Sequence, residues 1–326
     1  MILLGQEAAR DAFVAATASG ALHHAWLLTG PEGVGKGGFA REMALRLLAT
    51  AYDGRDRMTG AIASDHPVAA LIASGAHPDY RELVRLPKDP DKPDQDIARS
   101  IKAEQVRALQ PLLATKPTFA GRRVVVIDAI DDLERTGANA LLKSLEEPPV
   151  GTIFLLVSHS PGRLLPTIRS RCRQLRFDPL PADQVAQVVR DRSPDLPDDE
   201  VSALVAAAAG SPGRALAYAG LSIAALDRDL ATIAADGDAD NRVRSRLARS
   251  LGAKAAQPRY AVFLERAPAL IAAAAADRNG PALRDALDAY DKARALATLA
   301  PAVSLLAETT VFEMAGHIAR LAPRPR

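Results

Sequence analysis

A glycine-rich turn after a short apolar run constrains this chain more than any other feature. The turn reads GPEGVGKG, with glycines at Gly30, Gly33 and Gly35 and a lysine at Lys36, and it follows the apolar run Ala25–Thr29. Glycines let backbone N–H groups curl around phosphate oxygens, and the positive end of a following helix points to the same place. The lysine reaches the terminal phosphates. The pattern predicts a strand, a nucleotide-binding loop and a helix within an α/β fold.

Two groups that ATP hydrolysis needs are missing. Gly37 follows the lysine, where the motif asks for a Ser or Thr hydroxyl to ligate Mg²⁺. A second apolar run ends in Asp128, which matches the Asp that helps to hold the metal in such ATPases. The next residue is Ala129, whereas hydrolytic relatives usually carry a Glu there. We therefore expect a degenerate nucleotide site that needs no cofactor and retains ATP or ADP weakly or as a vestige.

The first part of the chain alternates apolar runs with helical patterns, which predicts a mostly parallel sheet. We place this domain at residues 1–178, with residues 87–96, PKDPDKPDQD, as a solvated loop and Asp131 and Asp132 at the start of a helix. The predicted strands are Ala25–Thr29, Tyr80–Leu86, Arg123–Ile127, Ile153–Ser158 and Gln174–Phe177.

After Pro179 the strand-like runs disappear and Ala, Leu and Arg dominate, which predicts helices throughout. A break near Gly237 divides this part into two predicted helical domains, residues 179–236 and 237–326.

Composition narrows the possible functions. Lys and Arg number 41 against 39 Asp and Glu, a net charge of +2, and aromatic residues are 4 %, so neither bulk charge nor a stacking platform favours nucleic-acid binding. A single cysteine, Cys172, allows no internal disulfide, and its predicted role is packing. No stretch reaches the roughly 20 apolar residues of a membrane span, and the first residues do not resemble a secretory signal, so we expect a cytoplasmic protein without membrane contact.

The run NALLKSLEEPP at residues 139–149 resembles the NALLKxLEEPP signature of bacterial DNA polymerase III clamp-loader subunits. The later run LLPTIRSRC resembles the Ser-Arg-Cys motif of the same family, at the expected distance from an apolar strand. The resemblance covers about the first 220 residues. Three further matches are Gly5-Gln6-Glu7, His24-Ala25-Trp26-Leu27 and His77-Pro78-Asp79.

The resemblance implies an AAA+ fold: a five-stranded P-loop domain, a small helical lid over 179–236 and a C-terminal helical collar for oligomerisation over 237–326. Because Gly37 and Ala129 replace the catalytic groups, the chain is most similar to the delta-prime branch, whose own site is degenerate. Such a subunit belongs to the DNA polymerase III holoenzyme, a nucleotidyltransferase complex, without hydrolysing ATP itself.

The resemblance also assigns roles to three residues. Arg171 would be an arginine finger that completes the ATP site of a neighbouring subunit; the alternative is a surface arginine in a basic run. Ser158 would sense the γ-phosphate, or simply cap the end of its strand. Arg214 would be a second sensor on the lid, or an exposed helix residue.

The implied partners are the delta subunit on one side and a gamma or tau motor on the other. The assembly would load the sliding clamp on primed DNA, with slight DNA contact by this chain. Many members carry a four-cysteine zinc module, but the matching stretch, Ala51–Pro78, has no cysteine. His66 and His77 alone do not make a tetrahedral site, so we predict no metal there.

Two alternatives stay open. One is a gamma-like clamp-loader ATPase that tolerates Gly37. The other is a different AAA+ or phosphate-loop protein, such as a helicase or a small-molecule kinase. Ala129 argues against the helicase, and Gly37 argues against the kinase.

Overall fold

The computed structural model describes residues 4–89, 91, 97–119 and 121–323, and the chain divides into two compact units. The first unit is Met1–Gln184 and the second is Val185–Arg326. The division falls within helix α8 (Ala182–Arg192). Both units bury apolar side chains, so each has a hydrophobic core.

The first unit is built on a parallel sheet with the strand order β2-β3-β4-β1-β5. Its central strands β1, β3 and β4 are buried along almost their whole length, as expected where helices cover both faces of a parallel sheet. In the described residues the strands are β1 (Ala25–Thr29), β2 (Tyr80–Val84), β3 (Arg123–Asp128), β4 (Thr152–Ser158) and β5 (Arg173–Arg176).

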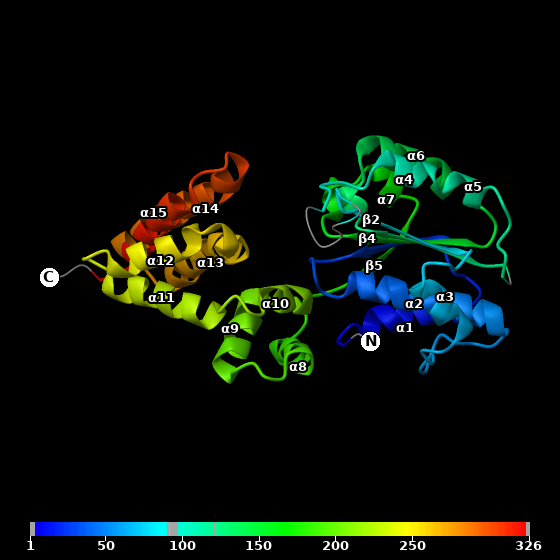
Figure 1. Ribbon diagram of the computed structural model, residues 1–326, viewed down its shortest axis with the longest axis horizontal. Coiled ribbons are helices and arrows are strands. Elements are labelled where there is room, and N and C mark those ends of the chain that lie inside the picture. Colours follow the sequence, from blue (N-terminus) through cyan, green and yellow to red (C-terminus); the bar gives the residue numbers. More distant parts are fainter. Residues whose placement is uncertain (1–3, 90, 92–96, 120, 324–326) are drawn as a thin grey trace. The chain divides into compact units, whose positions relative to one another are not determined.

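Helices cover the sheet in two layers (Figure 1). The layer of α1, α2 and α3 packs aromatic rings of Phe13 and Phe39 near Trp26 and Phe177. On the other face, α6 buries Leu141 and Leu145, one turn apart, in the same core cluster as residues of β3 and β4. The helices are α1 (Glu7–Ala18), α2 (Lys36–Asp53), α3 (Pro67–Ala73), α4 (Ala103–Arg107), α5 (Gln110–Leu113), α6 (Arg135–Glu146) and α7 (Pro166–Arg169).

The predicted fold class, a parallel α/β domain followed by helices, is confirmed. All five predicted strands form, and each end lies within two residues of the predicted one. The predicted loop over 87–96 lies partly outside the described residues. The prediction that Asp131 and Asp132 open the next helix was wrong, because they lie in a 3₁₀ turn, Ile130–Asp132, and α6 begins only at Arg135.

A buried ion pair between Asp79 and Arg123 lies at the start of β3. Asp79 is 0 % and Arg123 1 % exposed, and their side chains lie 3.4 Å apart. Asp79 also accepts hydrogen bonds from the backbone N–H groups of Thr118 and Phe119, at 2.8 Å each. Arg123 donates to the carbonyl oxygen of Thr115 at 3.0 Å. These bonds satisfy a charge pair that would be costly to bury alone, and they fix the loop that leads into β3.

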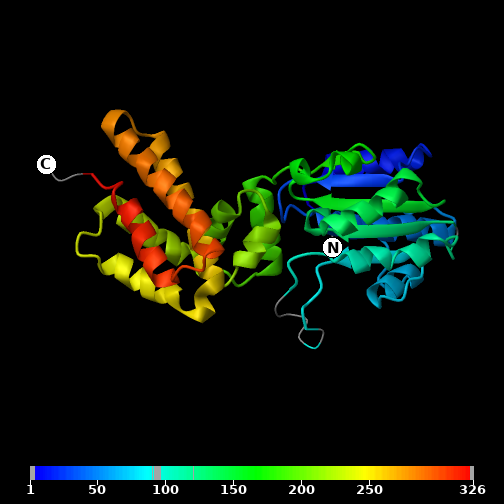
Figure 2. The same cartoon turned by 90° about the horizontal axis from the view of Figure 1, so that it is seen from above.

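The second unit consists of helices in its described residues. Alanine is abundant in this part of the chain, and small side chains let helix axes approach closely. The helices α14 and α15, coloured orange and red, lie side by side (Figure 2). The α-helices of this unit after α8 are α9 (Asp198–Ala208), α10 (Pro212–Tyr218), α11 (Ile223–Asp236), α12 (Arg242–Gly252), α13 (Gln257–Ala276), α14 (Gly280–Ala302) and α15 (Ala307–Ala319).

Gly237, at φ 77°, ends α11, and the further division of this unit at that residue stays a prediction. Among the described residues, no helix has the length and apolar character to cross a membrane.

Candidate functional site

The phosphate loop lies between β1 and α2, as the sequence predicts. Gly30, Gly33 and Gly35 all have positive φ angles, of 147°, 78° and 104°. These values are strained for a residue with a side chain. At Gly30 a Cβ would also overlap the carbonyl oxygen of Phe177, so this glycine lets the loop pass directly over the end of β5.

The side chain of Lys36, the first residue of α2, is buried against this loop. Its Nζ donates to the carbonyl oxygens of Gly30 and Pro31, at 2.6 and 2.5 Å, and the residue is only 2 % exposed. Burial lowers the pKa of Lys36 to about 8, against the opposing negative charge of Asp128. The lysine that would meet phosphate is therefore partly titratable in the neutral to mildly alkaline range.

Asp128, at the end of β3, is engaged by an arginine. Arg41 lies on α2 one turn after Gly37 and donates from Nη2 to Asp128 Oδ2 at 3.1 Å. Its Nε donates to Glu82 Oε1 of β2 at 2.7 Å. The sequence analysis missed this cluster; the only signal was the i, i+4 spacing of Gly37 and Arg41 on one helix face.

The residues around Gly37 do not fit the magnesium site of phosphate-loop ATPases. Gly37 has no hydroxyl, and a Cβ at this position would overlap the Asp128 carboxylate. The negative charge of Asp128, which should help to hold the metal, is already paired with Arg41. A hard divalent cation needs oxygen ligands with uncompensated charge, and this arrangement withholds them.

Ser158 lies at the end of β4, beside Thr29 of β1 in the sheet register, and is fully buried. Its hydroxyl donates to Asp131 Oδ1 at 3.0 Å. Asp131 also accepts from the backbone N–H groups of His159 and Ser160, at 2.7 and 3.1 Å. The structure thus brings Ser158 to the same sheet edge as the phosphate loop and gives its hydroxyl an acceptor within the chain.

Arg171 lies at the opposite end of the sheet, where the amino ends of the parallel strands meet. Strand β5 begins two residues after it, and the first residue of β5, Arg173, pairs with Trp26 near the start of β1. The phosphate loop leaves β1 only after Thr29, three residues and about 10 Å of strand further along. Arg171 therefore lies away from the phosphate loop of its own chain.

The side chain of Arg171 is held by two groups at that end. Its Nη2 lies 2.6 Å from Oε1 of Glu146, the last residue of α6, and its Nη1 donates to the carbonyl oxygen of Thr167 at 2.8 Å. One third of the side chain stays exposed. The adjacent Cys172 packs against the core cluster of the first unit, and burial raises the pKa of its thiol to about 12, as expected for a packing role.

Arg214 belongs to the second unit, on α10. Its guanidinium pairs with Glu265 of α13 and donates to the hydroxyl of Tyr218 at 3.0 Å. Tyr218 in turn donates to Glu265 at 2.8 Å. In this structure Arg214 therefore links two helices of the second unit.

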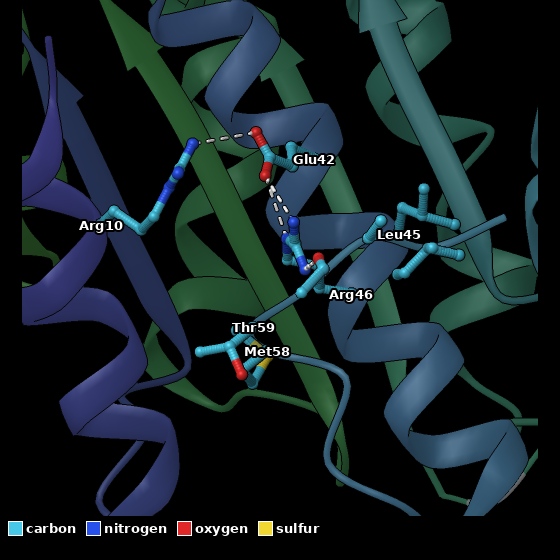
Figure 3. Close-up of a pocket in the computed structure, with 9 residues that line it drawn as sticks. Arg10, Glu42, Leu45, Arg46, Met58 and Thr59 are labelled. Atoms are coloured by element: carbon cyan, nitrogen blue, oxygen red, sulfur yellow. Dashed lines mark hydrogen bonds and ion pairs between the residues drawn. The ribbon is translucent and has the colours of Figure 1, made fainter. Parts of the chain in front are cut away.

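No cluster of three or more metal-ligating side chains occurs among the described residues. Arg46 of α2 anchors the loop that follows this helix. It donates to the carbonyl oxygens of Arg57 and Gly60, at 3.0 and 2.8 Å, and pairs with Glu42 at 2.9 Å. Arg10 of α1 and Glu42 and Arg46 of α2 border a hollow of about 490 Å³ (Figure 3).

Comparisons with known proteins extend these observations. A family model described as "DNA polymerase III, delta subunit" matches residues 5–181. The chain is 40 % identical over 190 residues to DNA polymerase III subunit delta' of Pseudomonas aeruginosa, which covers 58 % of this chain and 53 % of the relative. It is 33 % identical over 207 residues to the delta' subunit of Escherichia coli, which covers 64 % of this chain and 58 % of the relative.

A tau/gamma subunit is similar as well. The DNA polymerase III subunit tau/gamma of Haemophilus influenzae is 31 % identical over 232 residues, which covers 70 % of this chain and 31 % of the relative. The matched region thus spans little more than half the length of the two delta' relatives and a smaller part of the tau/gamma relative.

Proposed function

Since the chain belongs to the DNA polymerase III clamp-loader family, in the group described as delta subunits, we propose that it is a non-hydrolysing, delta-prime-like subunit of the replicative clamp loader. Its part in the reaction would be to supply Arg171 in trans to the ATP site of a neighbouring motor subunit. The assembly would use that ATP to load the sliding clamp on primed DNA.

The position of Arg171 carries this proposal. An arginine finger stabilises charge that develops on the transferred phosphoryl group, so its guanidinium must reach a nucleotide. Arg171 lies at the edge of the sheet opposite to the phosphate loop of its own chain, and one third of its side chain is exposed. That placement suits a nucleotide held by another subunit.

The proposed lack of hydrolysis by this chain rests on the residues of its own nucleotide site. Gly37 and Ala129 lack the side chains that would ligate a metal ion and orient the attacking water. The pairing of Asp128 with Arg41 removes a further metal-holding group. These features support a subunit that acts on its neighbour's ATP and leaves its own site chemically idle.

The proposed partners rest on the relatives of this chain. Relatives of this chain are named as delta' and tau/gamma subunits of DNA polymerase III. We therefore propose a gamma or tau motor as the neighbour that receives Arg171 and the delta subunit on the other side. Residues 237–326 would be the part that assembles with them. The net charge of +2 agrees with slight direct contact to DNA.

Two observations favour a second candidate, a gamma-like motor. The glycines and the lysine of the loop are intact, and the chain is 31 % identical to a tau/gamma relative. ATP turnover by the isolated chain distinguishes the two functions. The proposed subunit shows no turnover above the level of its Lys36→Ala variant, whereas a motor shows turnover that the same substitution abolishes.

A further inference from the structure

A second positively charged side chain, Arg41, lies close to the phosphate loop. Arg41 lies on α2, four residues after Gly37, between two carboxylates that come from neighbouring strands. It donates to Glu82 at 2.7 Å and to Asp128 at 3.1 Å. Asp128 ends β3, so the arginine lies beside the loop that follows β1 on the same edge of the sheet.

This ion pair fills the position that a metal-ligating hydroxyl would take. A Cβ on residue 37 would overlap the carboxylate of Asp128, and Arg41 Nη1 lies 3.2 Å from the same point. Glycine is thus the residue that leaves room for the ion pair. The lack of a hydroxyl at residue 37 and the Arg41–Asp128 ion pair therefore belong to the same local structure.

The arginine stays charged in this place. Burial opposes the charge, but the hydrogen bond to Glu82 and the negative charges of Glu82 and Asp128 outweigh it and raise the pKa of Arg41. About half of its side chain is exposed, and in the described part of the chain Nη1 has no hydrogen-bond acceptor. A guanidinium with free N–H donors is well suited to phosphate oxygens.

From this arrangement we infer that Arg41 takes the place of Mg²⁺, and that the loop binds a nucleoside polyphosphate without a divalent metal ion. The loop amides and Lys36 hold the phosphates, and the remaining N–H donors of Arg41 bind phosphate oxygens where a metal ion otherwise lies. The inference concerns this chain alone and does not depend on Arg171. An Arg171 that proves silent in the assembly leaves it standing, and its own failure leaves the role of Arg171 untouched.

Calorimetric titration of the isolated full-length chain with ATP and with ADP tests the inference, once in Mg²⁺ and once in EDTA. The expected result is binding with the same Kd in both buffers. Arg41→Gln weakens binding in EDTA by about 10- to 100-fold, the range for a hydrogen bond to a charged group. Arg55→Gln, a change of an exposed arginine in the loop after α2, leaves the Kd unchanged.

A double variant reverses the arrangement. Arg41→Ala removes the internal cation and releases the Asp128 carboxylate that crowds residue 37, and Gly37→Ser supplies the missing hydroxyl. The double variant is expected to bind ATP more tightly in Mg²⁺ than in EDTA, and its unfolding curve verifies that it is folded.

Three results overturn the inference. They are binding by the unchanged chain that is lost in EDTA, no binding in either buffer, and an Arg41→Gln variant that binds as tightly as the unchanged chain. The first two comparisons use the unchanged protein, so they do not depend on how any variant folds.

Discussion

Nη2 of Arg171 lies 2.6 Å from Oε1 of Glu146, at the edge of the sheet opposite to Lys36. Glu146 is the last residue of α6, the helix of the NALLKSLEEPP run. The proposed finger therefore has a carboxylate partner within its own chain. Both side chains are partly exposed, so this pair contributes at most about 1 kcal/mol. A neighbour's triphosphate, with more negative charge, can displace such a partner.

Glu146→Gln tests whether this carboxylate competes with the neighbour's nucleotide. The substitution keeps the shape of the side chain and removes its charge, so Arg171 becomes easier to transfer to phosphate. The ATPase rate of an assembly reconstituted with delta and gamma subunits is expected to rise. A lost pair of about 1 kcal/mol corresponds to up to about fivefold at the one motor site that receives Arg171, so the rise for the whole assembly is smaller. A fall in the rate would show instead that Glu146 positions Arg171 for catalysis.

Gly37→Ser is expected to destabilise the chain without restoring ATP hydrolysis. The new side chain meets the Asp128 carboxylate, and overpacking of this kind costs about 1–3 kcal/mol. Urea unfolding measures the change. Gly162→Ser is the matched control, because a Cβ at Gly162 finds no atom within 4 Å. Its expected change is within about 0.5 kcal/mol. Equal stability of the two variants would contradict the crowding at Gly37.

ATP affinity of the isolated chain is expected to fall as the pH rises above about 8. Burial lowers the pKa of Lys36 to about 8, and phosphate favours the charged amine, so binding at higher pH requires uptake of a proton. The association constant then falls by up to about tenfold per pH unit. Below pH 7 the lysine is already charged and the affinity is flat. Titrations between pH 6.5 and 9.5 measure the profile, and a constant affinity over that range would contradict it.

The sheet and the phosphate loop could be predicted because their signals are local. Apolar runs bounded by Gly, Pro or Asp predicted all five strands to within two residues. Such runs are required in β1, β3 and β4, because these strands are buried on both faces. In the structure Lys36, Asp128 and Ser158 lie near one end of the sheet, because the carboxyl ends of its parallel strands meet there.

The ion pairs of the site could not be predicted in the same way. Arg41 meets Asp128 across 87 positions of the chain, and Arg171 meets Glu146 across 25. Long charged side chains have many reachable partners, and only the finished packing selects one. The partner of Asp131 could not be predicted either. Its sequence position suggested the start of a helix, whereas its carboxylate accepts a hydrogen bond from Ser158 at the end of β4.

The ATPase rate of the complete assembly tests the central claim most directly. The assembly of this chain with delta and gamma subunits, clamp and primed DNA is compared with assemblies that carry Arg171→Ala or Arg163→Ala. Arg163 is an exposed arginine close by in the sequence. An arginine finger contributes about 10³-fold or more at its own site, but only one of several motor sites receives Arg171. We predict a clear partial loss with Arg171→Ala, no change with Arg163→Ala, and intact assembly in both. An unchanged rate for Arg171→Ala in an intact assembly would contradict the account.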